Sequence, residues 1–368
     1  MLDFVNIIYV LTIMLILNKY YHFKNIYFMM MILHLFSIFL FNGFLFDASY
    51  MPDQFEYFKI AKDIRNLDYN SVNLNTVGIS SVFFALFPIP FINSIYSICI
   101  INYLLYLFLF FFLLKNNILN SKFIIYFYLF FPSLLMYSSL SLRDMTIFVI
   151  MSLGIHFLLV KQKYVFAFLI FSLLGFIKVQ NLLILIFSTF LWIIFTNEII
   201  PKINKIFIYF ILGIIFLNYY EYFSIDKINY YRHAFFNENL YDRKDAFVPL
   251  HSYFDIFIRI IPDSLNFLLR PFPWNEFGVF QLIQFFENII VLFVIISILL
   301  KEKRYNLYKK KEIIFLNLFL LVGLTIYGLV IFNSGTAVRY KMPFIVIYII
   351  YSLYFINSYK IRNIKCVV

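Results

Sequence analysis

Four cationic side chains interrupt an otherwise apolar chain at places that would suit a negatively charged ligand. Arg143 lies near the end of a polar hairpin predicted over residues 132–144, Lys178 lies in a short break between apolar runs, Arg270 precedes two prolines, and Arg339 precedes the last apolar run. Guanidinium and ammonium groups bind phosphate oxygens through charge-assisted hydrogen bonds. If the four side chains meet, we expect a pocket for a diphosphate or a similar anion, with Asp53, Asp144 and Glu287 near it. Their convergence is a hypothesis.

Asp53 opens the segment Asp53-Gln54-Phe55-Glu56-Tyr57, which continues to Arg65 with apolar residues at 57, 60, 61 and 64. This spacing predicts one apolar face of a helix that lies along the membrane surface. Asp53 has two interpretations that the sequence leaves open. It is either the N-cap of this helix, with Glu56 completing a capping box, or a general base held just above the bilayer.

Other polar residues accompany the four cations. Gln180 follows Lys178, which is either a snorkelling lysine or a buried cation, and Trp274 follows the prolines after Arg270. Lys341 lies two residues after Arg339. Gly335 and Thr336, just before them, would let the backbone approach phosphate oxygens closely. Each residue also has a purely structural interpretation, as a helix cap or a headgroup contact.

The composition requires a bilayer as solvent. Of 368 residues, 63% are hydrophobic and only 13% are charged, whereas soluble domains carry about 25% charged residues. The two cysteines are too few for a disulfide framework, and no pattern of zinc ligands is present. The net charge of +11 is expected to reflect cytoplasmic loops of a membrane protein and not nucleic-acid binding.

Apolar stretches predict an all-α polytopic integral membrane protein with about eleven transmembrane helices in a single domain over residues 1–368. The predicted spans are 4–17, 26–46, 92–114, 123–135, 145–160, 164–176, 182–195, 206–218, 285–300, 313–332 and 342–356. The stretch 79–90 contains two prolines and is too short to cross, so we expect it to be re-entrant or interfacial.

Charge distribution predicts the orientation. With the N-terminus outside, the cytoplasmic segments hold 17 Lys and Arg residues against three acids. This asymmetry obeys the positive-inside rule, which a layout shifted by one span would violate. Two larger loops, 47–78 and 219–284, then lie on the outer side. The candidate site residues also lie on this side, with Glu287 at the start of the span 285–300.

Five segments in this order resemble Wzy-type O-antigen and exopolysaccharide polymerases, which are related to glycosyltransferases of the GT-C fold. The matching segments are DQFEYFKIAKDI, FPSLLMYSSLSLRD, FIKVQN, LLRPFPWN with FFEN soon after, and GTAVRYKMP. They cover most of the chain in scattered patches. One departure is that Gln54 follows Asp53, where many GT-C enzymes have a second acid, so we expect no metal.

The resemblance implies a GT-C-like fold and an enzyme of lipopolysaccharide biosynthesis in the bacterial inner membrane. Such a polymerase transfers a glycan from undecaprenyl diphosphate to an acceptor repeat unit on the periplasmic face. Its expected partners are the lipid-linked oligosaccharide, the bilayer and a chain-length regulator, with no cofactor and no nucleic acid. The expected catalytic residues are Asp53, Arg143 and Arg339. The expected substrate-binding residues are Lys178, Gln180, Arg270, Trp274, Glu287 and Lys341.

Two other functions remain open from the sequence. A GT-C glycosyltransferase that adds a single sugar from a polyprenyl phosphate sugar would have the same architecture and a different product. A flippase for lipid-linked oligosaccharides would be expected to show repeat-like halves and cations deep inside its spans. The inferred charges lie instead at the outer ends of the spans, which favours a transferase.

Overall fold

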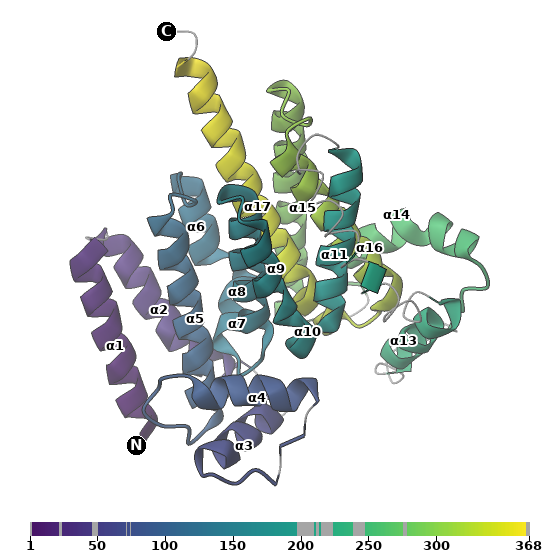
Figure 1. The fold of residues 1–368 in the computed structure, drawn as a ribbon. Helices are drawn as coiled ribbons and strands as arrows, with labels where there is room; N and C mark the ends of the chain where they lie inside the picture. Colours follow the sequence, from purple (N-terminus) through teal and green to yellow (C-terminus); the bar gives the residue numbers. More distant parts are fainter. Residues whose placement is uncertain are drawn as a thin grey trace. The chain divides into compact units, whose positions relative to one another are not determined.

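The structure is a computed structural model, and it describes residues 2–21, 24–45, 51–70, 72–73, 75–196, 210, 213–214, 224–237, 247–274 and 278–365. Every regular element within these ranges is a helix (Figure 1). The chain divides into two compact units, Met1–Val179 and Gln180–Val368, which are described separately below.

The first unit contains α1 to α10. Their bounds are α1 Leu2–Tyr21, α2 Asn25–Phe41, α3 Asp53–Arg65, α4 Thr76–Leu86, α5 Ile95–Lys115, α6 Lys122–Phe130, α7 Pro132–Ser139, α8 Asp144–Ile155, the π-helix η2 His156–Val160, α9 Tyr164–Ser172 and α10 Leu174–Ile177.

The second unit contains the remaining helices. Their bounds are α11 Val179–Phe195, which begins at the last residue of the first unit, α13 Ile225–Asn237, α14 Tyr253–Leu269, α15 Val279–Arg304, α16 Lys311–Val330 and α17 Ser334–Lys365.

Several helices identify a multi-pass membrane protein. Among the described residues, five helices are long and apolar enough to cross a bilayer: α1, α5, α15, α16 and α17. The bent pair α6 and α7 makes a sixth if it forms one broken span, and five shorter apolar helices of 10 to 17 residues accompany them. The prediction of eleven spans remains a prediction, and span 206–218 falls almost entirely outside the described residues.

Helix α5 forms the centre of the first unit, because it is apolar on all sides and touches α1, α2, α3, α7 and α8. Ser94 starts it with a capping box that Ser97 completes. A helix with no polar face is expected to be buried on all sides, and most residues of α5 are buried.

Helices α6 and α7 differ from the predicted layout. The segment 132–144 is not a hairpin throughout, since residues 132–139 form α7 at 47° to α6. Pro132 explains the break: proline disrupts the interior of a helix but is favourable at the first position of a new one. Only Leu140–Arg143 connects α7 to α8, and we call these four residues the α7–α8 connection.

Helix α3 forms where the sequence predicts it, but its apolar face packs on protein. Tyr57, Ile60 and Ala61 are buried, and the Tyr57 ring meets Phe84 of α4 edge-on at 6.0 Å. Protein therefore covers this face, and the prediction that the helix lies along the membrane surface stays a prediction. Pro52 occupies the N-cap position, so Asp53 is the first helical residue and not the cap.

Helix α16 organises the second unit, where it contacts α13, α14 and α17. Its small residues permit close packing. A Cβ atom on Gly328 would lie 2.7 Å from the backbone oxygen of Asp263 in α14, which only glycine avoids. This approach sets the contact between the C-terminal half of α14 and the last turns of α16.

Candidate functional site

The α7–α8 connection is held by the amide of a residue from the central helix. Asn102 is fully buried in α5, and its Nδ2 donates to the backbone oxygens of Leu140 and Leu142 at 2.6 Å each. A buried amide in an apolar helix is costly unless it is hydrogen-bonded. Asn102 therefore fixes the position of the connection against α5.

Two further amides hold the same region. The backbone N–H of Ser141 donates to Oε1 of Gln54 in α3 at 2.8 Å. Nδ2 of Asn42, just after α2, donates to the backbone oxygen of Ser139 at 3.0 Å. The Gln54 bond places the start of α3, and with it Asp53, in the neighbourhood of the connection.

Several buried polar atoms at this connection have no hydrogen-bond partner among the described residues. They are Oδ1 of Asn42, Oδ1 of Asn102, Oγ of Ser141, Nη1 of Arg143 and Oγ1 of Thr146. Leaving such a group unpaired costs about 1–3 kcal/mol. The set contains acceptors, hydroxyls and one charged donor, which is the mixture that a bound polar ligand or ordered water would satisfy.

The predicted site residues of the first unit have different exposures. Arg143 is half-buried, and Asp144 is buried as the first residue of α8, where the helix dipole favours a carboxylate. Lys178 is 7% exposed, which fits the buried cation better than a snorkelling lysine. Asp53 is exposed.

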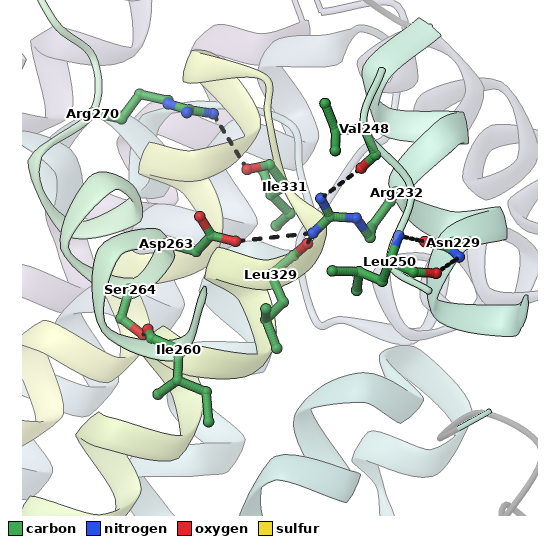
Figure 2. Close-up of polar contacts among 10 residues, drawn as sticks. All are labelled: Asn229, Arg232, Val248, Leu250, Ile260, Asp263, Ser264, Arg270, Leu329 and Ile331. Carbon is green, nitrogen blue, oxygen red and sulfur yellow. Dashed lines mark hydrogen bonds and ion pairs between the residues drawn. The ribbon is translucent and has the colours of Figure 1, made fainter. Parts of the chain in front are cut away.

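In the second unit, two arginines bind the C-terminal end of α16, as Figure 2 shows. Arg232 of α13 donates from Nη1 to the backbone oxygen of Leu329. Arg270 donates from Nη1 to the backbone oxygens of Ile331, at 3.3 Å, and Phe332. The last carbonyls of a helix lack partners within it and carry partial negative charge, so cations are favourable there.

Arg232 also faces a carboxylate. It is 1% exposed, and its Nη1 lies 3.9 Å from Oδ2 of Asp263 in α14 (Figure 2). Burial lowers the pKa of Arg232 and raises the pKa of Asp263, although each charge favours the other. Desolvation thus outweighs the attraction at this separation, as is common for buried ion pairs.

Lys341 caps the C-terminal end of α14. Its Nζ donates to the backbone oxygens of Phe267, Leu268 and Arg270 at 3.4, 2.8 and 2.5 Å. An ammonium has three N–H donors, so these three carbonyls use them all. We therefore infer that Lys341 positions the end of α14. Its predicted contact with substrate remains a prediction.

Asn288 completes this end of α14, because its Nδ2 donates to the backbone oxygens of Leu269 and Arg270. Glu287 beside it is 6% exposed and acts electrostatically on Lys341. Glu287 was predicted to lie at the start of a span, but the helix that contains it, α15, already begins at Val279. We call Arg232, Asp263, Arg270, Asn288 and Lys341 together the second-unit cluster.

The other predicted residues of the second unit lie outside this cluster. Arg339 is half-buried, with its guanidinium 5.8 Å from the ring centre of Tyr340. Trp274 is 72% exposed and stacks on Phe272 at 4.9 Å. Gln180 is exposed. The backbone N–H groups of Gly335 and Thr336 donate to Oδ1 of Asn333.

The structure thus brings five of the nine predicted site residues into two places. Asp53 and Arg143 lie near one connection in the first unit, and Arg270, Glu287 and Lys341 meet in the second. A single pocket for Arg143, Lys178, Arg270 and Arg339 would need both units and stays a prediction. Within the described ranges, no three His, Cys, Asp or Glu side chains are grouped as metal ligands.

Sequence reasoning missed Asn102 and Asp263. A lone amide within the apolar run of α5 is a signal that could have identified Asn102, because polar residues inside spans are costly and tend to have a role. Asp263 follows Asp255 and Arg259 at four-residue spacing, which would have placed all three on one helical face.

No protein-family model, curated protein or solved structure matches this chain.

Proposed function

We propose that the protein is a polymerase of lipid-linked oligosaccharide repeat units in a bacterial inner membrane. It would transfer a glycan from undecaprenyl diphosphate to an acceptor repeat unit at the periplasmic face. The multi-pass helical architecture suits a substrate whose polyprenyl chain stays in the bilayer. The site we favour is the α7–α8 connection with the adjoining start of α3.

One observation carries the proposal: the hydrogen bond between Gln54 and Ser141. Gln54 adjoins Asp53, and Ser141 is two residues from Arg143, so this bond brings a carboxylate and a guanidinium from distant segments into one neighbourhood. Asp53 is exposed, and Nη1 of Arg143 is buried without a partner. A base accessible to an acceptor and a cation with an unused donor are the two groups that glycosyl transfer from a diphosphate requires.

The proposed reaction is a displacement at the anomeric carbon. The acceptor hydroxyl attacks this carbon, a new glycosidic bond forms, and the bond from the sugar to the diphosphate oxygen breaks. The electron pair of that bond leaves with the diphosphate, whose developing charge Arg143 would stabilise. Asp53 would take the proton of the acceptor hydroxyl. Arg339 and the substrate-binding residues Lys178, Gln180, Arg270, Trp274 and Glu287 remain proposed contributors.

The test is complementation of a strain that lacks the gene. The wild-type chain should restore a ladder of long surface polysaccharide on a gel. Arg143→Gln and Asp53→Asn should each leave lipid-linked material carrying one repeat unit, at normal protein levels.

The outcome distinguishes the candidate functions. Normal ladders from both variants would refute the assigned site. If repeat units accumulate on the cytoplasmic side, the protein is a flippase. If the repeat unit itself lacks one sugar, the protein is a transferase for a single sugar.

A further inference from the structure

Helix α14 exposes a continuous apolar stripe. Its members are exposed by 48% to 73%: Phe254, Phe257, Ile258, Ile261 and Leu265. Their spacing of three and four residues puts them on one side of the helix, in a stripe roughly 100° wide that is typical of an amphipathic helix. Soluble surfaces rarely carry so many large apolar side chains together.

A second side of α14 is anchored to a membrane-spanning helix. Ser264, Phe267 and Leu268 are buried, and Oγ of Ser264 donates to Oγ1 of Thr325 in α16 at 3.2 Å. This contact lies within the last two turns of α16, which ends at Val330. Helix α14 is therefore anchored near the C-terminal end of α16, where a helix that crosses the bilayer would leave the hydrocarbon.

The third side of α14 is charged. Asp255, Arg259 and Asp263 are four residues apart and so lie along one face, next to the apolar stripe. Ser252 and Asp255 form a capping box that fixes the start of the helix. With 17 residues, three charges and an internal proline, α14 does not meet the requirements for a span.

We propose that α14 is an in-plane interfacial helix, whose apolar stripe inserts into the acyl chains of the outer leaflet. Arg259 on its charged face then meets lipid headgroups, as for other amphipathic helices at membrane surfaces, whereas Asp263 stays paired with Arg232. The depth set by α16 makes lipid the apolar medium that adjoins the stripe. This inference is independent of the proposed transferase activity.

Helix α3 provides the contrast within the same chain. Its apolar residues Tyr57, Ile60 and Ala61 are buried by protein, and its exposed side is mostly polar. Between α3 and α14, only α14 presents a broad apolar stripe outward, so a lipid contact is inferred for α14 and not for α3.

The experiment places a nitroxide spin label at Phe257→Cys or Ile261→Cys of the full chain in phosphatidylcholine and phosphatidylglycerol nanodiscs. Cys366 is replaced by alanine, whereas Cys99 is buried and is kept. Asn266→Cys, exposed on the charged side of α14, is the matched control. We expect the ratio of oxygen to nickel-chelate accessibility to be at least several-fold higher at 257 and 261 than at 266.

Two results would overturn the proposal. Equal ratios at 257, 261 and 266 would show that water covers the stripe. Exclusion of both reagents together with dipolar broadening between labels would show that a second copy of the chain covers it. The protein without an added cysteine should give no label signal, which checks that Cys99 remains unreactive.

Discussion

The α7–α8 connection and the second-unit cluster both gather polar and charged groups, but they use them differently. In the cluster, Arg232, Arg270 and Lys341 donate to carbonyls at the ends of α14 and α16. At the connection, Arg143 keeps a buried N–H without a partner. A cation near the end of a span is thus not by itself evidence of an anionic ligand, because helix C-termini compete for the same charge.

The first unit contains its own example of a capping cation. Arg65 at the end of α3 donates to the backbone oxygens of Ala85, Phe87 and Ile89, which terminate and follow α4. Arg65 and Arg143 belong to the same unit and differ in the use of their donors. Substitutions of these two arginines therefore form a matched pair.

Arg143→Gln should reduce polysaccharide formation by roughly 10²–10³-fold, the range seen when one donor to a developing negative charge is removed. Its free energy of unfolding should stay within about 0.5 kcal/mol of wild type, since no described carbonyl loses a donor. Chain length on gels and SDS-induced unfolding in micelles measure the two quantities.

The control for this variant is Arg65→Gln, which should lower stability and leave activity per folded molecule unchanged. If the two variants behave alike, the distinction between capping and ligand-binding cations fails for this unit.

Arg232→Met should lower the free energy of unfolding by about 3 kcal/mol. The change removes the donor to Leu329 and leaves the Asp263 carboxylate without its partner, which is the costly way to break a buried pair. Unfolding in mixed micelles measures the loss. Arg259→Met, at a half-buried position of α14, is the comparison and should cost less than about 1 kcal/mol.

Gly328→Ala should lower stability by about 1–3 kcal/mol, because the added methyl would push α14 away from α16. Thermal unfolding in nanodiscs would detect the change. Gly335→Ala is the control, as the nearest neighbouring atom would be 3.5 Å from its Cβ. Similar melting temperatures for both variants would contradict the close approach.

The smallest expected effect is the dependence of the free energy of unfolding on pH. Burial raises the pKa of Asp263, so the folded protein binds this proton more tightly than the unfolded chain does. The contribution of Asp263 to stability is then fully present below its ordinary pKa and is lost as the pH rises through the raised value. Relative to Asp263→Asn, the wild-type protein should gain stability on acidification from pH 7 to pH 4. A constant difference between the two would contradict the assigned shift.

The sequence predicted the helical membrane class and much of the helix layout, because a long apolar run has few alternatives in a bilayer. It also identified Arg270, Glu287 and Lys341 as polar positions worth attention. It could not predict that Lys341 donates to carbonyls of α14, since this contact joins residues more than 70 positions apart. The hydropathy of a residue describes its own side chain. It does not show which backbone carbonyl that side chain will contact.

The differences between prediction and structure in α3 and in the segment after Pro132 have a similar origin. The periodic pattern in α3 predicted an apolar face but not its partner, because lipid and a neighbouring helix satisfy the same pattern. The segment after Pro132 was predicted to be a polar hairpin. Its serines also fit a helix when their hydroxyls bind the preceding turn, as Ser138 does with the backbone oxygen of Leu134. Local sequence therefore identified the polar region and missed its geometry.

The Lys341 cap has a consequence for biosynthesis. A ribosome completes α14 and begins α15 and α16 well before it reaches residue 341. Until then, three carbonyls at the end of α14 lack the donor that later binds them. The end of α14 therefore cannot reach its final hydrogen bonding until the start of α17 has been made, and quality-control proteases would encounter chains truncated before residue 341 without these three hydrogen bonds.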